Sequence, residues 1–200
     1  MILVLVAAAS LWVGTAPPTP EASEPVRSEE TRGIHIPDET LVDQDGHPVR
    51  LASELSGRRA VVVNFLFTTC STICSPMSAV FARLRRELGE PEGKDVLFLS
   101  VSLDPVRDTP ERLKRFAEKF EPGPRPGWSF LTGEPERVKR VLQALGGWVP
   151  DKTSHTPVTL VGNPATGKWI RLNGMPTPSR LREALSEVGQ PLEKTAEVQR

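Results

Sequence analysis

The sequence predicts an α/β sandwich, in which strands and helices alternate along the chain. Two continuous apolar runs, residues 59–67 and 96–102, are typical of strands covered on both faces. Each run is followed by a segment whose apolar residues recur at helical spacing. The 200 residues, 38% of them hydrophobic, are sufficient for one domain with a sizeable core.

The first half of this domain follows from local signals. Residues 41–51 predict a hairpin of two short strands around the turn Asp45-Gly46. The strand at 59–67 comes next, and a helix follows it and stops at Gly89. The apolar face of that helix comprises Met77, Val80, Phe81, Leu84 and Leu88.

The alternation continues to the end of the domain. After the strand at 96–102, Asp108 or Thr109 can cap a helix with Pro110 in its first turn. The apolar face of this helix comprises Leu113, Phe116, Ala117 and Phe120. The remaining predicted elements are a helix at 134–145, strands at 158–162 and 168–172 around a turn at 163–167, and a last helix at 177–188. This order is that of a thioredoxin-like sandwich with an N-terminal β-hairpin extension.

The ends of the chain differ from the domain at 34–188. Residues 1–16 are uncharged and mostly apolar, which indicates a signal peptide or a short membrane anchor, with a buried N-terminal strand or helix as the alternative. Residues 17–33 hold four prolines and show no hydrophobic period, so we expect a flexible tether. Residues 189–200 form a polar tail. We therefore expect an exported protein, periplasmic or held at the outer face of the inner membrane.

The charge balance excludes some partners. Twenty-five basic residues cancel twenty-five acidic ones, so no overall field attracts nucleic acid or an anionic membrane. We expect no nucleic-acid partner, and membrane contact only through the N-terminal anchor.

The two cysteines, Cys70 and Cys74, directly follow the strand at 59–67, where a helix should begin. Thiols at a helix N-terminus are biased towards thiolate, the form that attacks disulfides and binds soft metals. Redox exchange and metal binding are both open. A purely structural disulfide would close a very short loop and remove little unfolded-state entropy. That disulfide and two inert buried thiols remain as alternatives.

Four motifs in order resemble the Sco/SenC family: Phe67-Thr-Thr-Cys70-Ser-Thr-Ile-Cys74, Ser100-Val-Ser-Leu-Asp104-Pro-Val-Arg-Asp108-Thr-Pro110, Leu131-Thr-Gly133 and Ser154-His155. The resemblance covers about residues 34–188. It implies an exported, membrane-tethered, thioredoxin-like domain that binds copper through two cysteines and a histidine. It also implies a role in assembling the dinuclear copper site of cytochrome c oxidase.

The implied ligands are Cys70, Cys74 and His155. Two thiolates select Cu(I) and an imidazole helps to accommodate Cu(II), whereas a closed structural zinc site would need a fourth ligand. Without the resemblance, a lone histidine in a polar loop is more often an exposed or capping residue. His35 and His47 are predicted to be surface residues.

Some positions leave alternatives open. Asp104 and Asp108 are either turn and cap residues or a shell that supports the site. Many family members have a proline directly after the second cysteine, whereas Ser75 precedes Pro76 here, which suggests a helix entry shifted by one residue. Pro157 occupies the position of the proline, commonly cis, that faces the cysteines in thioredoxins.

The main hypothesis is a copper metallochaperone that delivers to the copper-site subunit of cytochrome c oxidase. The alternative is a thiol-disulfide oxidoreductase acting on that subunit or on another exported thiol protein, in which one cysteine attacks a partner disulfide and the other resolves the mixed disulfide. We expect Cys70 to be the more exposed thiol, and the sequence leaves open which cysteine attacks first. Whether the protein is an enzyme stays open. A peroxidase is a third class, but Arg58, Arg59 and Arg83 have no spacing that identifies a peroxide-stabilising set.

Overall fold

The computed structural model describes residues 26–31, 34–89, 95–123, 126–154 and 156–189. Their centre is a six-stranded sheet in the order β1-β8-β7-β4-β5-β6. Strands β4 (Ala60–Leu66), β5 (Val96–Ser102) and β6 (Trp128–Leu131) run parallel. Antiparallel strands β7 (Val158–Asn163), β8 (Lys168–Asn173) and β1 (Arg27–Thr31) extend the sheet on the other side of β4.

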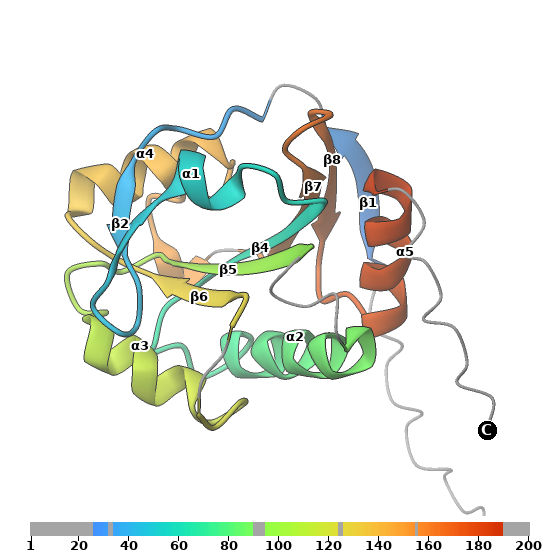
Figure 1. Ribbon diagram of the computed structural model, residues 1–200. Coiled ribbons are helices and arrows are strands. Elements are labelled where there is room, and N and C mark those ends of the chain that lie inside the picture. Colours follow the sequence, from blue (N-terminus) through green and yellow to red (C-terminus); the bar gives the residue numbers. More distant parts are fainter. Residues whose placement is uncertain (1–25, 32–33, 90–94, 124–125, 155, 190–200) are drawn as a thin grey trace, which may run out of the picture.

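Helices cover both faces of the sheet (Figure 1). On one face lie α2 (Cys74–Leu88), α3 (Pro110–Ala117) and α5 (Pro178–Val188), which share a core cluster with the sheet. On the other lie α1 (Leu51–Leu55) and α4 (Pro135–Ala144), beside the hairpin of β2 (Thr40–Val42) and β3 (Pro48–Arg50). The α/β, thioredoxin-like sandwich with its N-terminal hairpin is therefore confirmed.

The central strand shows why its sequence is continuously apolar. Val62 and Leu66 of β4 pack into the core beneath α2, while Val61 and Val63 pack into the core beneath α4. Every residue of β4 and β5 is buried, since each strand has neighbours on both edges and helices on both faces. The rigid strand ends that result position the loops of the site.

The predicted element boundaries are largely correct, and the structure decides between the two candidate caps of α3. Gly89, with φ of 64°, ends α2 in the left-handed conformation that glycine adopts without strain. Thr109, and not Asp108, caps α3, because its side chain accepts a hydrogen bond from the Arg112 amide. Asp108 is thereby free of the capping role and has another, described below.

The predicted tether at 17–33 is wrong for Arg27–Thr31, which form the edge strand β1. This strand is polar and mostly exposed, so its sequence lacks the alternation of a half-buried strand. Its order comes from backbone pairing with β8, which the local sequence does not reveal. The short helix α1, strand β6 and a 3₁₀ turn at Lys152–Ser154 were also not predicted.

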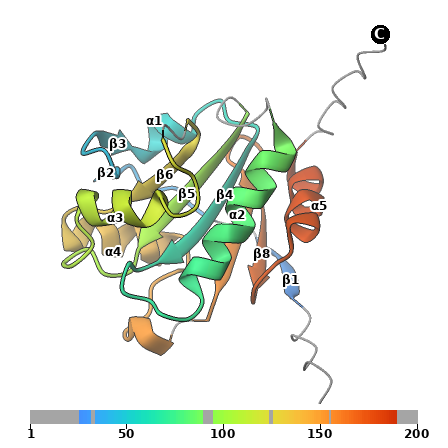
Figure 2. The same cartoon turned by 90° about the horizontal axis from the view of Figure 1, so that it is seen from below.

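Several loops meet at one end of the sheet, which we call the cysteine end. Strands β4 and β5 end there, and β7, antiparallel to β4, begins there. Figure 2 shows the start of α2 at this end, near the orange segment that precedes β7. The sheet thus brings together loops that are far apart in the sequence.

The predicted signal peptide or anchor at 1–16 lies outside the described residues, as does nearly all of the polar tail at 189–200. Among the residues that the structure describes, no helix has the length and apolar character needed to cross a membrane.

Candidate metal site

The cysteine loop, residues 67–73, joins β4 to α2. Cys74 is the first residue of α2 and is 2% exposed, whereas Cys70 is only partly buried. The Cys74 amide donates a hydrogen bond to the Cys70 sulfur at 3.4 Å, and the Cys70 amide donates one to the Phe67 carbonyl at 3.1 Å. The expectation that Cys70 is the more exposed thiol is confirmed. Both cysteines are free thiols in this structure.

The surroundings of the two thiols separate their pKa values. Burial opposes ionisation of Cys70, but hydrogen bonds from the Cys74 side chain and from the backbone of residues 72–74 outweigh it and lower its pKa to about 7. Burial raises the pKa of Cys74 to about 12, and its hydrogen bond to Cys70 and the nearby charges of Cys70 and Asp108 act in the same direction. Near neutral pH Cys70 is therefore partly ionised, while Cys74 stays a buried thiol.

The start of the cysteine loop is fastened by Asp108. This carboxylate is fully buried and accepts hydrogen bonds from the Thr68 amide at 3.1 Å and the Thr68 hydroxyl at 2.6 Å. The Ser102 hydroxyl donates a third at 2.6 Å. The loop after β5 therefore fixes the chain two residues before Cys70.

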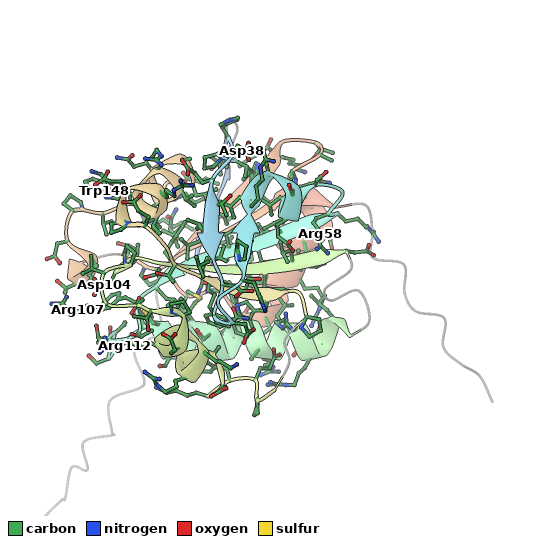
Figure 3. All side chains as sticks on the ribbon, turned by 60° about the vertical axis from the view of Figure 1, so that its left-hand side comes forward. Asp38, Arg58, Asp104, Arg107, Arg112 and Trp148 are labelled. Atoms are coloured by element: carbon green, nitrogen blue, oxygen red, sulfur yellow. The ribbon has the colours of Figure 1, made fainter. Side chains whose placement is uncertain are left out.

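A second carboxylate of the same loop reaches the segment before β7. Asp104 forms an ion pair with Lys152 and accepts a longer hydrogen bond, 3.4 Å, from Arg107. Asp104 and Arg107 lie close together on this loop (Figure 3). The Lys152 ammonium also lies 5.7 Å from the centre of the Phe67 ring, over the residue that starts the cysteine motif.

The predicted ligand His155 lies outside the described residues. Its described neighbours are held at the cysteine end. On one side is the 3₁₀ turn Lys152–Ser154. On the other, the Pro157 carbonyl accepts a hydrogen bond from the Gly174 amide at 2.9 Å, and the Thr159 hydroxyl donates one to the Met77 sulfur at 3.8 Å. Every described peptide bond is trans, including the one before Pro157.

Other candidates lie away from the cysteine pair. His47 is in the hairpin turn, where its side chain is 76% exposed, and His35 is also exposed. Arg58 and Arg59 precede β4 at the opposite end of the sheet, and Arg83 pairs with Glu87 on α2. The surface prediction for both histidines is confirmed.

Lys152 was not predicted as part of the site, because a single lysine in a polar loop carries no signal. Its partner Asp104 is 48 residues away in the sequence. Thr68 and Ser102 were missed for the same reason, since their hydrogen bonds to Asp108 depend on the packing of β4 beside β5.

The donors present fit a soft metal ion. A partly exposed, readily ionised thiol and a buried thiol four residues apart supply two sulfur ligands, the kind that Cu(I) prefers. The thiol of Cys74 must lose its proton before it can bind a metal. Within the described residues, no three Cys, His, Asp or Glu side chains gather closely enough to hold a metal ion.

Comparison with known proteins identifies the family. The SCO1/SenC family model matches residues 29–160, which include both cysteines, Asp104, Asp108 and His155. The chain belongs to the SCO1/SenC family. A SCO1 protein homolog of Bacillus subtilis is 43% identical over 94 residues, which are 47% of each chain. The chain spans about half the length of the first curated SCO1/SenC relatives that it matches.

Solved structures of SCO1/SenC relatives agree with the fold. BsSco aligns with a TM-score of 0.60 and 30% identity, over 76% of this chain and 93% of that one. It is described as a member of the Sco family of cytochrome c oxidase assembly proteins and has a disulfide switch. Arabidopsis thaliana ScoI with copper bound aligns with a TM-score of 0.58 and 25% identity, over 74% and 94%. Copper is thus the metal bound in this relative of known structure.

Proposed function

We propose that this protein is an exported copper metallochaperone that helps to assemble the dinuclear copper site of cytochrome c oxidase. Cys70 and Cys74 are its thiolate ligands and His155 is the third. The observation that carries the proposal is the pairing of a partly exposed sulfur at Cys70 with the buried thiol of Cys74, at the end of the sheet where β7 begins.

The different exposure of the two sulfurs suits copper as a cargo. Cys74 is buried within the first turn of α2, so it can anchor the ion, while Cys70 is reachable by a ligand from another protein. Transfer then proceeds by exchange of ligands, with Cys70 giving way to a donor of the acceptor. The acceptor is the copper-site subunit of the oxidase.

The His155 assignment is tested by replacing it with alanine. The reduced His155→Ala protein should bind copper at least about tenfold more weakly in a competition titration, because the site loses one of three donors. His47→Ala is the matched control, since His47 is exposed in the hairpin turn. Equal affinities for the wild type and His155→Ala would contradict the assignment.

Thiol-disulfide exchange is the second candidate, favoured by the separation of the two pKa values. The Cys70 thiolate would attack a partner disulfide, forming a mixed disulfide and releasing one partner thiolate. Cys74, once deprotonated, would attack the Cys70 sulfur, forming a Cys70–Cys74 disulfide and releasing the second partner thiolate. Two electrons pass to the partner, and the chain becomes oxidised.

The two functions differ in their dependence on His155. Reduction of a model disulfide should survive His155→Ala, whereas Cys70→Ser and Cys74→Ser should each stop turnover with an added reductant. Turnover that persists in both cysteine variants would exclude the exchange reaction. Loss of copper binding with retained turnover in His155→Ala would assign the two functions to overlapping sets of residues.

The proposed location is the outer face of the inner membrane or the periplasm. The uncharged, apolar residues 1–16 support it, followed by the proline-rich stretch that precedes β1. A fusion of residues 1–26 to a reporter that folds only after export would test it, and a reporter retained in the cytoplasm would contradict it.

A further inference from the structure

Lys152 links three parts of the cysteine end that are separate in the sequence. It is the first residue of the 3₁₀ turn Lys152–Ser154, which directly precedes His155 in the sequence. Its side chain pairs with Asp104 on the loop after β5 and lies over the ring of Phe67 just after β4. Both partners are largely inaccessible, since the side chains of Lys152 and Asp104 are 23% and 9% exposed. An ion pair this shielded from water is weakened less by salt than a surface pair.

The loop after β5, which carries Asp104, is itself held by hydrogen bonds. Two hydrogen bonds fix the backbone at Asp104. The Asp104 amide donates to the Ser102 hydroxyl at 2.9 Å, and the Asp108 amide donates to the Asp104 carbonyl at 2.8 Å. Ser102 also donates to the Asp108 carboxylate that holds Thr68. One short loop therefore fixes the cysteine loop through Asp108 and the turn before His155 through Asp104.

We propose that Lys152 is a positioning residue for the copper site: its ion pair with Asp104 and its contact with Phe67 hold the 3₁₀ turn Lys152–Ser154, which leads into His155 in the sequence, against the cysteine loop. The inference rests on the proposed function for its consequence, copper affinity. The ion pair and the ring contact of Lys152, which together we call the latch, involve only this chain's residues, and their effect can be measured without copper.

The direction in which Lys152→Met changes the copper affinity distinguishes a positioning role from a purely electrostatic one. Lys152→Met keeps most of the aliphatic length but removes a positive charge near the site. If the charge alone mattered, its removal would tighten the binding of a cation. If Lys152 positions the histidine segment, its removal should weaken copper binding by about tenfold or more, as is usual for residues that orient metal ligands. Lys152→Arg keeps the ion pair and should restore most of the affinity.

The first readout is hydrogen exchange in the reduced, metal-free protein. Lys152→Met should speed amide exchange in the peptide covering residues 151–157, and Lys152→Arg should return it towards the wild-type rate. Lys168→Met is the matched control: the Lys168 ammonium donates to the Glu187 carbonyl at 2.6 Å, at the opposite end of the sheet. It should leave exchange in this peptide unchanged.

The second readout is copper affinity of the same variants, by competition titration with a chelator. Weaker binding in Lys152→Met, with recovery in Lys152→Arg and no change in Lys168→Met, is the expected result. Unchanged exchange at 151–157 in Lys152→Met would overturn the latch whether or not the protein binds copper. Faster exchange in Lys152→Met with unchanged or tighter copper binding would overturn the role of Lys152 in the copper site. A wild type that binds no copper would overturn the proposed function, while the exchange result for the latch would still stand.

Discussion

The carboxylate of Asp108 accepts hydrogen bonds from both the backbone amide and the hydroxyl of Thr68, at 3.1 and 2.6 Å. These two residues are 40 apart in the sequence. Because Thr68 stands two residues before Cys70, this contact ties the geometry of the cysteine loop to the loop after β5. A buried carboxylate thus acts on the site without offering itself as a ligand.

Asp108→Ala should lower the free energy of unfolding by about 2–4 kcal/mol, because it leaves the buried hydroxyl of Ser102 and the partly buried donors of Thr68 without their acceptor. Chemical denaturation of the reduced protein would measure the loss. Asp95→Ala is the control, since the Asp95 side chain is 43% exposed and pairs with Arg59 at 3.4 Å. Equal losses in the two variants would contradict the role given to Asp108.

Alkylation of the reduced protein should depend on pH mainly through Cys70. Its pKa is about 7, so the rate of reaction with iodoacetamide should rise from pH 5 and be half-maximal near pH 7, as the thiol becomes thiolate. Cys74, with a pKa of about 12 and little exposure, should stay unmodified over this range. Mass spectrometry of the labelled peptides would locate the adduct. Faster labelling of Cys74 than of Cys70 would reverse their proposed roles.

Copper binding should release protons. At pH 8 Cys70 is mostly a thiolate while Cys74 is still a thiol, so binding through both sulfurs should release about one proton, from Cys74. The apparent affinity should therefore rise with pH. Calorimetric titration in buffers of different ionisation enthalpy counts the protons. An affinity independent of pH would argue against Cys74 as a ligand.

Arg85 should contribute far more to stability than its neighbour Arg83. The Arg85 side chain is 1% exposed, pairs with Glu121 at 3.2 Å and lies 5.4 Å from the centre of the Trp128 ring. Arg85→Ala should cost about 3 kcal/mol, since it removes packing and strands a partly buried carboxylate. Arg83→Ala, on the same helix with a side chain 68% exposed, should cost much less by the same denaturation assay. A reversed order would show that the Arg85 pair is not stabilising.

The predictable part of the fold is the part with local signals. Thr177 and Pro178 start α5 and Gly89 ends α2 where the sequence indicates, because caps and glycine act on adjacent residues. The edge strand Arg27–Thr31 could not be predicted, because its pairing with β8 joins residues more than 130 positions apart.

The site divides in the same way. Cys70 and Cys74 stand out as candidates in the sequence because two cysteines at a strand-helix junction are a local pattern. Asp108 was foreseen only as a cap or supporting residue, since its contact with Thr68 depends on the parallel pairing of β4 and β5. Lys152 could not be foreseen, because its contacts arise from three separate loops.

The central claim is that Cys70, Cys74 and His155 bind copper. Its most direct test is an anaerobic titration of the reduced protein with copper, followed by the absorption spectrum of the cupric form. We predict one copper per chain and an intense thiolate-to-copper charge-transfer band that is lost in Cys70→Ser and reduced or shifted in His155→Ala. Absence of tight binding, or a cupric spectrum without that band, would contradict the claim.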